Sequence, residues 1–151
     1  MITTVRARLL FFAILAGLMF AELLFRNAAS LLTDLEGSAA AIGLSPESQQ
    51  IRLFLLIILD GIAGGGAILA ALAHWQRQFE DLGEIGVYMA TGGLVAYGTY
   101  QFMVGAFQVD DSGRIILFIG VFYFMLGLAA ARAGSEILET GRIRRRRTRR
   151  R

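Results

Sequence analysis

Residues 51–73 read IRLFLLIILDGIAGGGAILAALA, an apolar run long enough to cross a membrane as one helix. Asp60 lies near the middle of this run, and glycines follow it at Gly61, Gly64, Gly65 and Gly66. A carboxylate near the centre of a bilayer costs about 2.5 to 3.5 kcal/mol on insertion scales, so it indicates a functional or structural site with a partner elsewhere. The run therefore predicts a membrane helix with polar chemistry inside it.

The composition of the whole chain predicts the same class. Hydrophobic residues make up 56% of the 151 residues and the mean hydropathy is +0.58, above the roughly 45 to 50% apolar content of soluble domains. We expect one all-α integral membrane unit. The chain has no Cys and one His, which excludes disulfides and thiolate catalysis and argues against a multi-histidine metal or haem site. We therefore expect neither a metal nor a cofactor.

Four apolar segments predict a four-helix bundle, because each is near the roughly 20 residues needed to cross the hydrocarbon core. They cover about residues 9–25, 53–73, 85–107 and 115–131, within a membrane domain of residues 1–139. The first segment has a second interpretation as a signal peptide, since two arginines precede it. Glu22 and Arg26 interrupt the place where a cleavage site should lie, so we expect this segment to remain a span.

The arginines predict the orientation of the spans. Basic residues precede the first span, lie in the short second connection and follow the fourth span, at Arg6, Arg8, Arg77 and Arg132. The first and third connections are richer in acidic residues. By the positive-inside rule, both termini should be cytoplasmic, and we expect a multi-pass protein of a prokaryotic inner membrane.

The first connection, residues 27–50, has room for structure outside the bilayer. Leucines alternate there with acidic residues and predict a short interfacial helix around Leu31, Leu32, Asp34, Leu35 and Glu36. Ser45 followed by Pro46 is typical of a helix N-cap with proline in the first turn. The second helix should therefore begin before the membrane does.

The C-terminal residues 140–151 predict a disordered, arginine-rich cytoplasmic tail. Eight of the fifteen basic residues lie there: Arg142, Arg144, Arg145, Arg146, Arg147, Arg149, Arg150 and Arg151. Such clusters beside a span contact anionic lipid headgroups, or they act only to fix the topology. Nucleic acid is the less favoured partner, because no aromatic residue interleaves the arginines to stack on bases.

Small residues at helical spacing predict faces for helix packing, at Gly17, Gly61, Gly65, Gly93, Gly120 and Gly127. Small residues allow helix backbones to approach closely where lipid supplies no hydrophobic driving force. These faces would pack within the bundle or against an identical copy. Alternatively, the three glycines at residues 64–66 soften the helix beside Asp60 into a hinge, as in transporter sites.

Polar side chains of the spans gather in the outer half of the predicted bundle when depth is counted at 1.5 Å per residue. This layer contains Glu22, Arg26, Asp60, Tyr97, Tyr100, Gln101 and Tyr123. Glu22 and Arg26 are an i, i+4 pair and can neutralise each other. Asp60 then needs a donor from Tyr97, Tyr100, Gln101 or Arg26, and without one we expect its carboxyl group to be protonated.

The sequence favours a non-catalytic role, because HExxH, GxSxG, P-loop and dinucleotide-binding patterns are absent. We expect a structural or accessory subunit, or a self-assembling homo-oligomer, in which the polar layer fixes the register of the helices. The alternative is a small channel or transporter for protons, ions or small solutes that uses Asp60 and Glu22. A holin-like, membrane-permeabilising protein is a third interpretation.

Several short motifs also carry a family resemblance. They are AELLFR at residues 21–26, Glu47 and Ser48 at the start of the second span, Leu59 and Asp60 followed by Gly65 and Gly66, and the aromatic and acidic stretch at residues 75–80. In these motifs the chain resembles the YqhA-like family of small four-span bacterial inner-membrane proteins. The resemblance implies an inner-membrane protein with both termini inside and no assigned activity.

Overall fold

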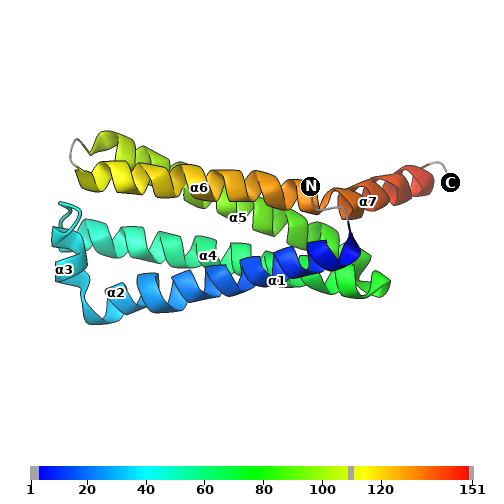
Figure 1. The fold of residues 1–151 in the computed structure, drawn as a ribbon, viewed down its shortest axis with the longest axis horizontal. Coiled ribbons are helices and arrows are strands. Elements are labelled where there is room, and N and C mark those ends of the chain that lie inside the picture. The colour runs from blue at the N-terminus through cyan, green and yellow to red at the C-terminus, as the bar shows by residue number, and fades with distance from the viewer. Residues whose placement is uncertain (1–3, 109–110, 150–151) are drawn as a thin grey trace.

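The structure, a computed structural model that describes residues 4–108 and 111–149, is almost entirely helical (Figure 1). Long helical stretches run alongside one another, and a shorter helix follows the last of them. In chain order the elements are α1 (Val5–Ala21), the π-helical segment η1 (Glu22–Ala28), α2 (Ala29–Thr33), α3 (Leu35–Ala40), α4 (Pro46–Trp75), the 3₁₀ turn η2 (Arg77–Phe79), α5 (Glu80–Phe107), α6 (Asp111–Ala133) and α7 (Ser135–Thr148). The predicted all-α class is confirmed for the described residues.

Within the described residues, three helical stretches are long and apolar enough to cross a membrane: Val5–Thr33, Pro46–Trp75 and Asp111–Ala133. The predicted membrane class agrees with this finding. The sequence predicted a fourth span at residues 85–107, and α5 covers those residues but is not among the three. The physical reason is its composition, because α5 carries many glycines together with Thr, Tyr and Gln residues that lower its hydropathy.

Side-chain caps fix where the helices begin. The Thr4 hydroxyl accepts a hydrogen bond from the backbone N–H of Ala7 at 3.2 Å at the start of α1. The Ser45 hydroxyl accepts one from the backbone N–H of Ser48 at 3.2 Å, and Pro46 is the first residue of α4. The predicted cap is thus confirmed, and α4 begins several residues before the apolar run.

The first connection is shorter than predicted. The first helix does not stop near residue 25 but continues through η1 and α2 to Thr33, because neither Gly nor Pro interrupts this stretch. The leucines at positions 31 and 32 therefore extend the first long helix, and the separate short helix is α3. Gly43, with φ of 68°, makes the turn that leads into α4.

The arginine-rich segment is helical to Thr148, whereas the sequence predicted disorder from residue 140. Arginine is a good helix former, and α7 continues the direction of α6 after an interruption at Gly134 (Figure 1). Ion pairs with α1 and α5, described below, hold α7 against the rest of the molecule. Arg150 and Arg151 lie outside the described residues.

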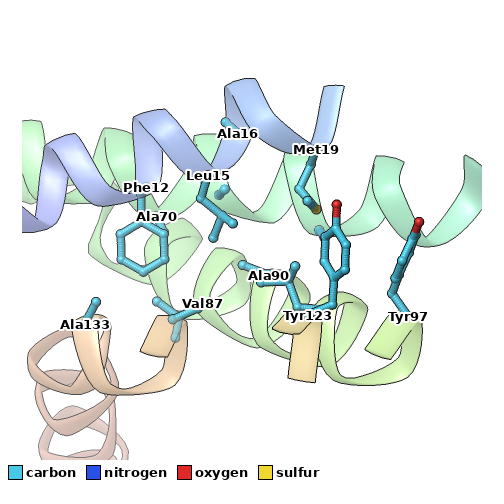
Figure 2. Close-up of a cluster of buried hydrophobic side chains, with 14 of the residues drawn as sticks. Phe12, Leu15, Ala16, Met19, Ala70, Val87, Ala90, Tyr97, Tyr123 and Ala133 are labelled. Atoms are coloured by element: carbon cyan, nitrogen blue, oxygen red, sulfur yellow. The ribbon is translucent and has the colours of Figure 1, made fainter. Parts of the chain in front are cut away.

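The helices pack in the order in which they follow one another along the chain. α1 lies along α4, α4 along α5 and α5 along α6, whereas α1 and α6 approach each other at few points. Buried side chains fill the space between α1 and the α5–α6 pair, among them Phe12, Leu15, Met19, Val87 and Tyr123 (Figure 2). α5 is consequently covered by protein on two sides.

Glycines allow α5 to approach both of its neighbours. A Cβ atom at Gly86 would lie 2.6 Å from the backbone oxygen of Gly66 on α4, and a Cβ atom at Gly98 would lie 2.6 Å from the backbone oxygen of Gly120 on α6. These distances leave no room for a side chain. The two seams therefore depend on backbone contact, as is typical of helix packing in membranes.

The predicted packing glycines divide into two groups. Gly93, Gly120 and Gly127 lie at close helix contacts, where an added Cβ would come within 3.0 Å of Ala63, Gly98 and Val95 respectively. At Gly61 an added Cβ would make only an ordinary contact at 3.8 Å with Leu23, and at Gly17 and Gly65 it would meet nothing within 4 Å. The α4 seam thus uses Gly66 in place of the predicted Gly61 and Gly65. Helix α4 continues through residues 64–66 without the break considered from the sequence.

Candidate functional site

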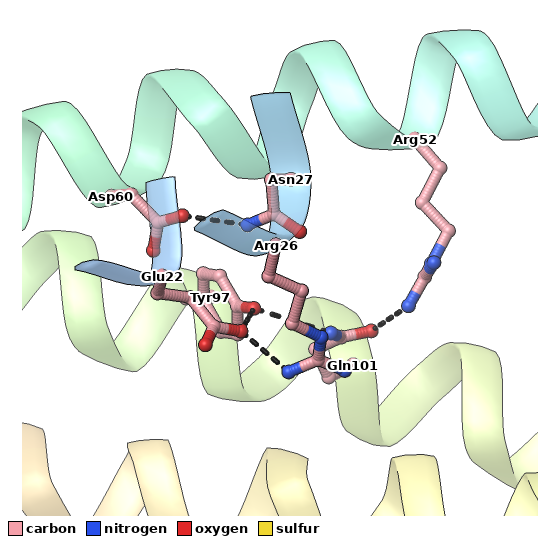
Figure 3. Close-up of polar contacts among 7 residues, drawn as sticks. All are labelled: Glu22, Arg26, Asn27, Arg52, Asp60, Tyr97 and Gln101. Atoms are coloured by element: carbon pink, nitrogen blue, oxygen red, sulfur yellow. Dashed lines mark hydrogen bonds and ion pairs between the residues drawn. The ribbon is translucent and has the colours of Figure 1, made fainter. Parts of the chain in front are cut away.

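A network of polar side chains lies where η1, α4 and α5 meet, in the half of the molecule that holds α2 and α3 (Figures 1 and 3). η1 supplies Glu22, Arg26 and Asn27 to this network. In an α-helix, Asn27 would point about 140° around the axis from Glu22. The i→i+5 turn of a π-helix brings residues five positions apart onto one face, so both side chains reach the interior.

Asp60 lies at the centre of α4 and is completely buried. The Nδ2 atom of Asn27 donates a hydrogen bond of 2.7 Å to its Oδ2 atom, and Asn27 is itself only 2% exposed (Figure 3). The donor is thus Asn27 and not one of the tyrosines, the glutamine or the arginine considered from the sequence. The second oxygen, Oδ1, is buried without a hydrogen-bond partner in the described part of the chain.

Glu22 connects η1 to α5. Its Oε1 atom accepts a hydrogen bond of 2.5 Å from Nη1 of Arg26, one turn later, and a hydrogen bond of 3.0 Å from the hydroxyl of Tyr97 (Figure 3). The Arg26 side chain is 46% exposed. Its aliphatic part extends outward, while its guanidinium group remains paired with the Glu22 carboxylate. The predicted i, i+4 pair is present in the structure and gains a partner on a second helix.

The network continues from Tyr97 through Gln101 to α4. The amide nitrogen of Gln101 makes a long hydrogen bond of 3.5 Å to the Tyr97 hydroxyl, and its amide oxygen accepts one of 2.8 Å from Nη2 of Arg52. Arg52 also donates to the amide oxygen of Gln49 at 3.2 Å, and Gln49 donates to the Ser38 hydroxyl of α3 at 3.2 Å. A continuous chain of hydrogen bonds therefore runs from the interior to α3.

Two ionisable side chains in this network have amide partners in place of ionic ones. Among the described residues neither Arg52, 6% exposed, nor Asp60 forms an ion pair. The Nε atom of Arg52, like Oδ1 of Asp60, is buried without a hydrogen-bond partner in the described ranges. Removing either charge from water is costly unless it is paired and hydrogen-bonded. The arrangement can lock helices together, and it leaves one acceptor and one donor open to a further group.

The other two predicted members of the polar layer play different parts. The ring of Tyr123 on α6 packs on the ring of Tyr97, with 4.4 Å between centroids, and is buried in the core. Tyr100 is partly buried and packs against the same core. Both side chains thus contribute aromatic packing beside the network.

Sequence reasoning missed Asn27, Gln49 and Arg52. All three lie at or beyond the predicted ends of the spans, in the stretch assigned to the first connection or its border with the second span. For Gln49 and Arg52 the signal was the Ser45–Pro46 cap, which starts α4 early enough to bring both residues into the helix. For Asn27 the sequence offered no signal, because its inward direction depends on the π-helical segment.

At the opposite end of the molecule, arginines of α7 pair with acidic residues at the start of α5. Nη1 of Arg144 lies 2.6 Å from Asp81, and Nη2 of Arg145 lies 3.1 Å from the buried carboxylate of Glu84. Arg8 of α1 pairs with Glu136 of α7. We call these contacts the α7 clamp, because they join α7 to two other helices.

The described ranges hold no group of three or more His, Cys, Asp or Glu side chains placed to bind a metal ion. Comparisons with protein-family models, curated proteins and solved structures found no match to this chain. The resemblance of its motifs to the YqhA-like family stays a prediction.

Proposed function

We propose that the protein is a non-catalytic, multi-pass membrane protein that acts through helix packing, as a structural or accessory subunit or as a self-assembling homo-oligomer. In this proposal the polar network fixes the register of the helices. The observation that carries it is the set of bonds between different helices: Asn27 to Asp60, Tyr97 to Glu22 and Arg52 to Gln101. A shift of any one of these three helices by a turn would break two of the three bonds.

The proposal includes α5 as a fourth span, which gives a four-helix bundle. α5 has 28 residues, about 42 Å at 1.5 Å per residue, and this exceeds the hydrocarbon core. It lies between α4 and α6, so protein contacts reduce the lipid-facing surface that would require apolar residues. With four spans, both termini lie on one side, which the positive-inside rule assigns to the cytoplasm of a prokaryotic inner membrane.

The outward faces of the helices support assembly in a membrane. On α6, Phe118, Phe122 and Met125 follow at i, i+4 and i+7 and are 73%, 56% and 58% exposed in the single chain. Apolar side chains at this spacing form one stripe, which would require lipid or a further helix to cover it. The proposal assigns these faces to lipid and to neighbouring subunits.

The test is the mass and composition of the particle extracted in a mild detergent. We expect either a defined homo-oligomer or a particle with co-purifying foreign subunits, in which the Phe118→Ala and Phe122→Ala variants weaken the assembly. The matched controls Leu10→Ala and Ile14→Ala change an exposed face of α1. A monomer with no partners, after extraction in several mild detergents, would contradict the proposal.

A second function has one observation in its favour. The buried Oδ1 atom of Asp60 has no partner in the described chain, and a hydrogen-bonded chain lies beside it from Glu22 to Ser38. A channel or transporter for protons, ions or small solutes would use such a carboxylate. In proteoliposomes, Asp60→Asn should then abolish a pH-dependent flux while the particle keeps its mass. Absence of flux in the parent protein would remove this alternative.

A further inference from the structure

The arginines at residues 142–149 include two sets with different surroundings, and Arg147 belongs to neither because it lies on another face of the helix. Arg144 and Arg145 belong to the α7 clamp and are matched by acidic residues of α5. Arg142 and Arg146 of α7 and Arg149 at its C-cap are exposed and form no ion pair in the part of the chain that the structure describes. We call this second set the free arginine stripe.

The free arginine stripe occupies one face of α7. Its members follow at i, i+4 and i+7, so their side chains lie one above the other along the helix. Together with Arg145 and Thr148 they line an open hollow of about 460 Å³. A second hollow lies at the N-terminal end of the stripe and is lined by Glu139, Arg142 and Arg146. Glu139 is the acidic residue that lies closest to the stripe in the sequence.

This cationic surface is held in place before any ligand binds. Ile137 is buried in the core, and Gly141 lies against the carboxylate end of the Glu84 side chain. Arg144 and Arg145 fix the middle of the helix to α5. A surface that is already ordered loses less conformational entropy when it binds a ligand.

The clamp also fixes the height of the stripe relative to the membrane. Arg144 bonds Asp81, which lies a few residues after Trp75 at the end of α4. Trp75 is 70% exposed, and exposed tryptophans at the ends of membrane helices mark the lipid headgroup layer. The beginning of the stripe, at Arg142, therefore lies next to the proposed headgroup layer, and the rest of it extends from there along α7 (Figure 1).

We propose that the free arginine stripe binds the phosphate groups of anionic phospholipid headgroups. Guanidinium groups bind phosphate with two parallel hydrogen bonds, and several of them converge here around one hollow. The headgroup layer brings phosphates to this height, whereas a nucleic acid would find no aromatic side chain among the arginines on which to stack. The inference rests on the proposed membrane placement and is independent of the polar network.

The experiment is native mass spectrometry of the purified full-length chain in detergent with equal amounts of phosphatidylglycerol and phosphatidylcholine. We expect the wild type to retain phosphatidylglycerol preferentially. The triple variant Arg142→Gln, Arg146→Gln, Arg149→Gln should lower this preference at least about tenfold, since each basic residue near the surface contributes about fivefold. The control variant Arg6→Gln, Arg77→Gln, Arg132→Gln removes the same charge elsewhere and should keep most of the preference.

Each other result has a definite meaning. An unchanged preference in the stripe variant, or an equal loss in the control, would overturn the proposal. A third outcome is that the wild type and the control variant bind a labelled single-stranded RNA, whereas the stripe variant loses the RNA but retains lipid as the wild type does. This outcome would replace lipid by nucleic acid as the partner. A wild-type protein that stays in solution without detergent would instead contradict the proposed membrane placement. This result distinguishes failure of the membrane placement from failure of the lipid-binding proposal.

Discussion

Replacing Gln101 by leucine should destabilise the protein far more than the small change in side-chain volume implies. Gln101 is completely buried, and its amide oxygen accepts the 2.8 Å hydrogen bond from Arg52. A hydrogen bond to a charged group contributes about 1.5 to 3 kcal/mol, whereas an average bond between membrane helices contributes about 0.6 kcal/mol. We expect a loss of about 2 kcal/mol, mostly because the Arg52 charge stays buried with one acceptor fewer.

A double-mutant cycle separates this cause from simple loss of packing. Arg52→Met removes the charge, and in that background Gln101→Leu should cost less, because no buried guanidinium is left without its acceptor. The expected coupling energy is about 1 to 2 kcal/mol. Tyr100→Phe, one residue away on α5, removes a hydroxyl outside the network and serves as the control, with an expected change within about 0.5 kcal/mol.

The assay is reversible unfolding in mixed micelles of a mild detergent and dodecyl sulfate, followed by far-ultraviolet circular dichroism. The free energies of unfolding of the wild type, the two single variants and the double variant complete the cycle. If the effects of Gln101→Leu and Arg52→Met are simply additive, the two side chains are not coupled. The reasoning that the network fixes the helices would then be refuted.

Three further predictions concern other parts of the structure. Asn27→Leu should lower the free energy of unfolding by about 1 to 3 kcal/mol in the same assay, because it removes the one donor that the described chain provides to Asp60. Gly86→Ala should destabilise the protein by about 1 to 3 kcal/mol through overpacking. Its control Gly65→Ala, where nothing lies within 4 Å, should be neutral or stabilising. Equal effects of the two substitutions would contradict the close contact between α4 and α5 at Gly86. Glu84→Gln should loosen α7 and raise its cleavage rate by trypsin several-fold, with the rate of the wild type as the reference.

The apolar pattern predicted the long helices well because their period and length are dictated by the bilayer. Residues 53–73 became the middle of α4, and the Ser45–Pro46 cap placed its start correctly. Depth counting along ideal helices also placed Glu22 and Gln101 in the same half of the bundle, and both lie in the network. These predictions needed only local geometry.

The remaining features depend on deviations from ideal helices and on partners distant in sequence. The π-helical turn that directs Asn27 inward has no signature in composition. The helicity of the arginine segment depends on Glu84 and Asp81, about sixty residues earlier, which neutralise part of its charge. Predicting either feature would have required knowing the tertiary contacts first.

The sequential packing of the helices has a consequence for how the chain is made. Each later long helix finds one of its neighbours in the fold, the preceding helix, already synthesised, so assembly can follow the order of insertion. The pair formed by the first long helix and α4 can close the Asn27–Asp60 bond alone. Arg52, however, has to wait for Gln101 on α5 before it gains its acceptor on another helix. A nascent chain halted after α4 and before α5 would therefore hold the Arg52 guanidinium group without its acceptor Gln101. This group would distinguish the incomplete chain from the finished protein.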